Sequence, residues 1–137
     1  MVTADQSGYR NLRVWQRAMD CAEMIHTVTR GFPKDELYGL TSQIRRAANS
    51  VPLNIAEGYK RRRYKRKYLQ ALIYASGSEG EVETAIELAQ RFKYIAPNQA
   101  GEMAAQYDEV GRMLSALIAR IEADIEKEER EGGGKRE

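Results

Sequence analysis

The chain has 137 residues, of which 42% are apolar and 31% charged, with three prolines and a single cysteine. This composition suits a soluble helical domain better than a disordered chain or a membrane protein. No stretch of about 18 apolar residues occurs, which argues against a membrane-spanning helix. One cysteine also excludes an intrachain disulfide. No apolar segment follows a basic start, so we expect a cytoplasmic protein.

The formal net charge of +2 conceals an uneven distribution. Residues 1–70 carry 14 Lys and Arg against 6 Asp and Glu, whereas residues 71–137 carry 8 against 14. A chain with this asymmetry can present a basic surface to an anion while it stays near neutral overall.

A first helix is predicted from about Leu12 to Arg30, after a polar segment, residues 1–8, that we expect to be flexible. Its apolar residues follow two adjacent stripes with 3-4 spacing, which together make a wide apolar face. The stripes are Leu12, Trp15, Met19, Ala22 and His26, and Val14, Ala18, Cys21, Ile25 and Val28. On such a face we expect Cys21 to be a buried thiol and His26 a hydrogen-bonded core residue.

A second helix begins between Asp35 and Thr41, either of which can serve as its N-cap, and continues to about Ala56 or Tyr59. Its apolar seam is Leu37, Leu40, Ile44, Ala47, Val51 and Ile55. Pro52 lies inside this pattern and predicts a kink, because it removes one backbone hydrogen bond.

A third helix covers roughly Lys65 to Tyr94, and a fourth runs from about Gln99 to Glu128 with Asn98 as its cap. Gly77 and Gly80 lie within the third helix, where each costs about 1 kcal/mol relative to Ala. This cost predicts that another helix approaches their backbone closely. The last residues, 129–137, include three consecutive glycines and are expected to form a flexible tail.

Four helices with short connections predict an all-α fold, an antiparallel up-down-up-down four-helix bundle whose second helix is kinked by proline. We expect one domain over residues 1–137, with its core at about 9–128.

Between the second and third helices lies a run in which seven of nine residues are Lys or Arg: Tyr59–Lys67, YKRRRYKRK, here called the basic corner. Dense cations bind nucleic-acid phosphates with release of counterions, Arg adds bidentate geometry, and tyrosines can stack on bases. The predicted nucleic-acid-binding residues are Tyr59, Lys60, Arg61, Arg62, Arg63, Tyr64, Lys65, Arg66 and Lys67, with Arg45 and Arg46 widening the surface.

Two other interpretations of the basic corner stay open. Its cations could pair with an acidic protein surface, including Glu126–Glu131 of a neighbouring copy, or they could form a solvated corner. The helix macrodipole argues against the solvated corner, because positive charge is disfavoured at the N-terminus of the third helix and only Glu57 is near in sequence. An anionic partner would compensate for this placement.

Four polar residues are predicted to form a structural network between helices: Asn54, Glu57, Ser78 and Glu81. Ser78 and Glu81 interrupt an apolar stripe, and a buried carboxylate needs a partner. A di-metal site in a bundle requires Glu-x-x-His pairs, and the single histidine has no such glutamate. Known catalytic motifs do not occur either. We therefore expect a protein without catalytic residues, metal or cofactor.

Several motifs occur in order along the chain: LRVWQ at residues 12–16, LTSQIRRAA at 40–48, SVPLNIAEG at 50–58, Gly77-Ser78 with Glu81 and Glu83-Thr84, and DEVGRML at 108–114. Together, over about residues 9–125, they resemble the four-helix-bundle proteins encoded in intervening sequences of 23S ribosomal RNA genes. The resemblance implies a bundle that assembles as a ring, commonly a pentamer. The accessory variability protein of diversity-generating retroelements is similar in fold, which implies binding to nucleic acid and to a reverse transcriptase.

The basic corner is more basic than this family pattern leads us to expect, which favours nucleic-acid binding. We therefore expect a non-enzymatic homo-oligomer that binds RNA or DNA, with a reverse transcriptase as a candidate partner and no membrane association. The alternative is a structural or protein-interaction module whose basic corner pairs with acidic protein surfaces.

Overall fold

The computed structural model describes residues 8–136, including side chains as far as Gly132. Within this range the chain forms four α-helices: α1 (Arg13–Thr29), α2 (Leu40–Lys60), α3 (Lys65–Arg91) and α4 (Pro97–Arg136). Two short 3-10 helices, η2 (Gly8–Asn11) and η3 (Lys34–Glu36), precede α1 and α2. Residues 1–7 of the segment expected to be flexible lie outside the described range.

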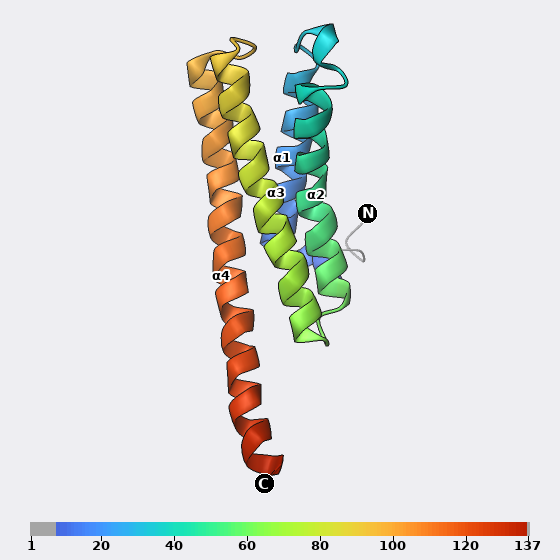
Figure 1. The fold of residues 1–137 in the computed structure, drawn as a ribbon, viewed down its shortest axis with the longest axis vertical. Coiled ribbons are helices and arrows are strands. Elements are labelled where there is room, and N and C mark those ends of the chain that lie inside the picture. Colours follow the sequence, from blue (N-terminus) through green and yellow to red (C-terminus); the bar gives the residue numbers. More distant parts are fainter. Residues whose placement is uncertain (1–7, 137) are drawn as a thin grey trace.

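The helices alternate in direction along one long axis, and each connection is short (Figure 1). Contacts are most extensive between α2 and α3 and between α3 and α4, while α1 packs on α2 and α4. The predicted all-α, up-down-up-down bundle is therefore confirmed. No helix in the described part of the chain combines the length and the apolar character needed to cross a membrane.

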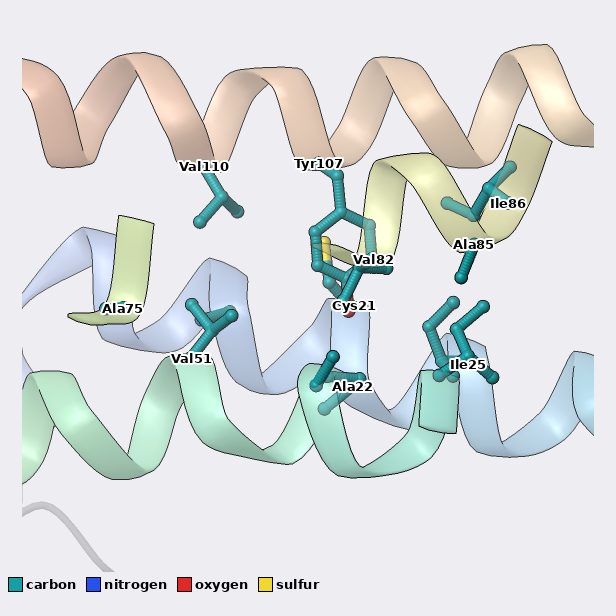
Figure 2. Packing of buried hydrophobic residues seen from close by; sticks show 14 of the residues in the cluster. Cys21, Ala22, Ile25, Val51, Ala75, Val82, Ala85, Ile86, Tyr107 and Val110 are labelled. Atoms are coloured by element: carbon teal, nitrogen blue, oxygen red, sulfur yellow. The ribbon is translucent and has the colours of Figure 1, made fainter. Parts of the chain in front are cut away.

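The core runs along the inner faces of all four helices (Figure 2). Most of the second stripe predicted for the first helix is part of it: Val14, Ala18, Cys21 and Ile25 are buried. Of the first stripe Ala22 is buried, whereas Met19 is 44% exposed. The ring of Tyr107 reaches from α4 toward Cys21 on α1 and Val82 on α3. Among the described α-helices, α1 contacts only α2 and α4, and these two cover less of its surface than the two stripes occupy. Part of the apolar face of α1 therefore stays exposed.

The N-terminus of α2 is capped by Glu36, which the sequence pattern did not indicate. Its Oε1 accepts a hydrogen bond from the Leu40 N–H at 3.0 Å, and its Oε2 accepts one from the Tyr94 hydroxyl at 2.6 Å. These hydrogen bonds lower the pKa of Glu36. The predicted caps were wrong: Asp35 makes no side-chain cap hydrogen bond, and Thr41 is buried inside the helix. Leu37, placed in the seam of this helix, is exposed because α2 begins only at Leu40.

Pro52 lies inside α2, as predicted, and the helix continues past it to Lys60. The kink itself stays a prediction. Helix α3 ends at Arg91, earlier than expected, where Lys93 adopts a left-handed conformation with φ of 67°. The N–H groups of Lys93 and Tyr94 donate to the carbonyls of Gln90 and Ala89, which is the Schellman pattern for ending a helix.

Helix α4 differs from its predicted bounds at both ends. It begins at Pro97, so the expected cap at Asn98 is wrong; proline suits the first helical position because it has no N–H to satisfy there. At the other end α4 continues to Arg136, although an end near Glu128 followed by a tail was expected. The helix thus extends well past the corner between α2 and α3 (Figure 1).

Close helix approach occurs at a different glycine from those predicted. A Cβ added at Gly77 or Gly80 would meet no other atom within 4 Å, so no described helix approaches these positions. At Gly58, near the end of α2, a Cβ would lie 2.8 Å from the Ala71 Cβ and 3.0 Å from the Tyr68 ring. Gly58 therefore permits the contact between α2 and α3 directly above the basic corner.

We expect Gly58→Ala to lower the free energy of unfolding by roughly 1–3 kcal/mol, because the added methyl overpacks a contact with a neighbouring helix. Gly77→Ala is the matched control, and it should raise this free energy by about 0.5–1 kcal/mol through helix propensity alone. Urea unfolding of the two variants measures both values. Equal effects of the same sign would contradict this assignment.

Candidate nucleic-acid interface

The basic corner is a tight turn between two helix ends. Lys60 is the last residue of α2 and Lys65 the first of α3. Within the turn, the Arg61 N–H donates to the Gly58 carbonyl at 2.9 Å and the Tyr64 N–H to the Arg61 carbonyl at 2.8 Å. Backbone hydrogen bonds and the close contact at Gly58 therefore hold the turn, so the backbone that carries its cations is fixed in position.

The two tyrosines of the corner have different surroundings. Tyr59 is half-buried, with its ring edge-on to Tyr68 at 6.3 Å and the Arg62 guanidinium 4.0 Å above its centre. Tyr64 is 56% exposed, with Arg63 at 5.3 Å and Lys67 at 5.7 Å from its ring centre. Tyr64 is more exposed than Tyr59 and its nearest cation lies farther from the ring centre, so Tyr64 is the more accessible of the two for base stacking.

Three corner cations pair with carboxylates. On the α2 side, the Arg61 guanidinium lies 3.5 Å from Glu57, one helical turn earlier. On the α3 side, Lys65 pairs with Glu128 and Arg66 with Glu129, both on α4. The hydrogen bond to Glu128 raises the pKa of Lys65.

The remaining four corner cations have no carboxylate partner among the described residues: Lys60, Arg62, Arg63 and Lys67. The corner is therefore partly neutralised and partly open. One interpretation of the sequence pairs the basic corner with the acidic stretch Glu126–Glu131 of a neighbouring copy. In the structure, Lys65 and Arg66 pair with this stretch of the same chain.

Arg45 and Arg46 do not join this surface. Arg46 precedes Lys60 by 14 positions on α2, which places it about 21 Å away along the helix. The Arg45 Nε donates to the Thr29 hydroxyl at 2.8 Å, and Arg46 donates to Ser42 at 3.3 Å. The expectation that these arginines widen the basic corner is therefore corrected.

The polar network between α2 and α3 is smaller than predicted and has Ser50 at its centre. The Asn54 amide donates to the carbonyl and the hydroxyl of Ser50, both at 2.9 Å, and the Ser78 hydroxyl donates to that of Ser50 at 2.8 Å. Glu57 pairs with Arg61 instead, and Glu81 is exposed. Two of the four predicted members, Asn54 and Ser78, thus belong to the network.

The buried carboxylate of the bundle is Glu79, which is only 7% exposed. Its Oε2 has no hydrogen-bond partner in the described part of the chain. Burial, followed by the neighbouring Glu83, raises the pKa of Glu79 to about 8. Opposite it on α4, Gly111 leaves room for the carboxyl, since a Cβ there would lie 2.7 Å from Oε1. The signal was present in the sequence, because Glu79 lies four positions after Ala75 and three before Val82, on one apolar stripe of the third helix.

Neither of the groups next to Glu79 gives it a catalytic partner. The Cys21 thiol is buried, and this burial raises its pKa to about 11, which makes it a poor nucleophile. The Tyr107 hydroxyl, also buried, has a raised pKa for the same reason. Asp108 and Glu83 add negative charge near Glu79, and no cation in the described part of the chain lowers its pKa.

The raised pKa of Glu79 predicts a pH-dependent stability. Between about 4.5, the ordinary pKa, and about 8 the folded state binds a proton that the unfolded state has lost, so the free energy of unfolding falls as the pH rises through this window. Each pKa unit corresponds to about 1.4 kcal/mol, so the loss is on the order of a few kcal/mol. Glu79→Gln should remove this dependence, as measured by urea unfolding at several pH values. Glu122→Gln, an exposed residue of α4, is the control and should retain it.

A largely apolar groove of about 800 Å³ lies between α1 and α2. Trp15 and Met19 line it from α1, and Pro52 and Leu53 from α2, with Leu53 67% exposed. At its rim the His26 Nε2 lies 3.1 Å from the Asn49 Oδ1, so this histidine is hydrogen-bonded as expected but only half-buried. An exposed apolar groove on a small domain is typical of an interaction surface.

The model of the family "23S rRNA-intervening sequence protein" matches residues 10–116. No curated protein matches the chain. A crystal structure of a protein of unknown function from the S23 ribosomal protein family of Bacteroides thetaiotaomicron is similar with a TM-score of 0.71 and 21% identity. The match covers 77% of this chain and 95% of that one, and at this identity it supports the fold.

Proposed function

Since the chain belongs to the family of 23S rRNA-intervening sequence proteins, we propose that it is a non-enzymatic, homo-oligomeric, cytoplasmic protein that binds RNA or DNA through the basic corner. The observation that carries this proposal is the group of cations without carboxylate partners among the described residues, Lys60, Arg62, Arg63 and Lys67, on one tight turn between two helices. Such a cluster meets phosphates without large rearrangement of the fold. Binding would be mainly electrostatic, with Tyr64 available for base stacking.

We expect affinity for a short DNA duplex to fall steeply with salt. Four phosphate contacts predict a slope of about −3.6 in a plot of log K against log salt concentration. Arg62→Ala/Arg63→Ala should reduce the slope by about 1.8 and weaken binding at about 0.1 M salt by roughly tenfold or more. Fluorescence anisotropy with labelled DNA and RNA measures both quantities.

The matched control for this experiment is Arg91→Ala/Lys93→Ala, which removes two cations at the opposite end of α3. It should leave the slope unchanged. Binding that is absent, insensitive to salt, or weakened equally by both double variants would count against the basic corner as the nucleic-acid site.

Self-association is supported by the apolar groove between α1 and α2, because a second copy would cover side chains such as Met19 and Leu53 that one copy leaves in water. In an oligomer several basic corners could bind one polyanion, so the combined affinity would exceed that of one corner. The subunit number implied by the family resemblance, a pentamer, is part of this proposal.

Light scattering tests the oligomer. The wild-type protein should have a mass that is a multiple of 15.6 kDa, and Leu53→Glu should lower it because a charge is placed in the groove. Ile73→Glu is the control, since this residue of α3 is also about half-exposed and lies outside the groove. A wild-type monomer, or equal dissociation of both variants, would contradict the proposed interface.

A second candidate function is a protein-interaction module that pairs with acidic protein surfaces. It is favoured by the carboxylates that already contact the corner, those of Glu57, Glu128 and Glu129. Poly-glutamate that displaces DNA at equal charge concentration would favour this alternative. A reverse transcriptase is the protein partner that we propose from the family resemblance, and co-purification of the two proteins with and without nuclease tests that contact.

A further inference from the structure

The last turns of α4 leave the bundle. Ile125 is the last buried residue of this helix among the residues up to 132 whose side chains are described, and every residue of the next segment, Glu126–Glu131, is exposed. This segment, here called the acidic arm, passes beside the basic corner (Figure 1). Because the arm buries no apolar side chain, the described contacts between it and the rest of the chain are ion pairs: Lys65 with Glu128 and Arg66 with Glu129.

The two ion pairs compensate for an unfavourable placement of charge. Lys65 and Arg66 are the first two residues of α3, where the positive end of the helix macrodipole disfavours cations. No acidic residue lies in this first turn, so the carboxylates must come from elsewhere in the fold. Glu128 and Glu129 bring two adjacent negative charges to this position.

We propose that the acidic arm is a built-in competitor for the basic corner, and that a nucleic acid must displace Glu128 and Glu129 to contact Lys65 and Arg66. This inference rests on the proposed function and describes its regulation. With the arm in place four cations are available, and displacement frees Lys65 and Arg66 in addition. Exposed ion pairs are weak and screened by salt, so a dense polyanion can displace the arm, whereas an anion of low charge density gains too little from the corner to do so.

The experiment compares two double variants with the same change of charge on the same arm. Glu128→Gln/Glu129→Gln removes the two ion pairs with the corner. Glu126→Gln/Glu131→Gln removes two carboxylates that take part in none of the corner's described ion pairs, and Glu126 pairs instead with Arg130 on the arm itself. For a short labelled DNA duplex, the first variant should bind severalfold to tenfold more tightly than wild type at about 0.1 M salt, with a slope steeper by up to about 1.8. The second variant should keep the wild-type slope.

A second measurement needs no ligand. Acetylation of lysines, followed by mass spectrometry, should modify Lys65 more slowly than Lys60 and Lys67 in the wild-type protein, and Glu128→Gln should abolish this difference. Equal acetylation in the wild-type protein, or equal effects of the two double variants on DNA binding, would overturn the competitor. If neither the wild-type protein nor any variant binds DNA or RNA while Lys65 stays protected, the proposed function fails although the ion pairs exist. The arm then only stabilises the start of α3, and its role as a competitor is refuted as well.

Discussion

The contact of α2 with α3 at Gly58 is the constraint on which the functional part of the molecule depends. A helix pair usually meets through side chains, but here the Ala71 methyl and the Tyr68 ring occupy the place that a side chain at position 58 would need. The two helices therefore converge as they approach the turn, and the short connection Arg61–Tyr64 can join them. A wider separation of α2 and α3 would require a longer loop, and the cations would no longer lie together on one short turn.

The positive charge of the basic corner is compensated both by a near neighbour in sequence and by residues far along the chain. The corner collects seven cations within nine residues, which repel one another and oppose the macrodipole of α3. Part of the compensation comes from one turn earlier in α2, and part comes from the far end of α4, more than 60 positions later. The length of α4 beyond the core is thus connected to the charge of the corner, and the opposite charges of the two halves of the chain meet at one place.

Periodicity was sufficient to predict the four helices, their order and most of the core, because each helix has a repeating apolar stripe and each connection contains Gly, Pro or a dense charge cluster. It failed where a choice depends on partners distant in sequence. Glu36, not Asp35 or Thr41, caps α2 because Tyr94 from another corner holds its carboxylate. The close approach of two helices occurs at Gly58 and not at Gly77, because Gly58 faces Ala71 and Tyr68 of α3 whereas no described helix packs against Gly77. Which side of a helix meets a neighbour depends on the tertiary fold.

At the candidate site, too, local sequence features were predictable and contacts between distant residues were not. The nine-residue basic run was evident from composition alone, and the turn that carries it was predicted. Which of its cations are neutralised was not predictable, because that depends on which carboxylates of α4 reach the start of α3, and Glu129 lies in the stretch 129–137 that was expected to be a tail. Likewise Ser78 and Glu81 attracted attention as interruptions of a stripe, while Glu79, one helical position away, is the carboxylate that the fold buries.

Gly111 and Glu79 share one volume, and this restricts the order in which the two positions can change during evolution. Alanine at position 111 would favour the helix by about 1 kcal/mol, yet its methyl would meet the Glu79 carboxyl while that side chain remains. A smaller residue at position 79 removes this contact, whereas alanine at position 111 requires the Glu79 carboxyl to shift, so the change at position 79 is the easier first step. Among relatives, a side chain at the glycine position should therefore accompany the loss of the buried acid.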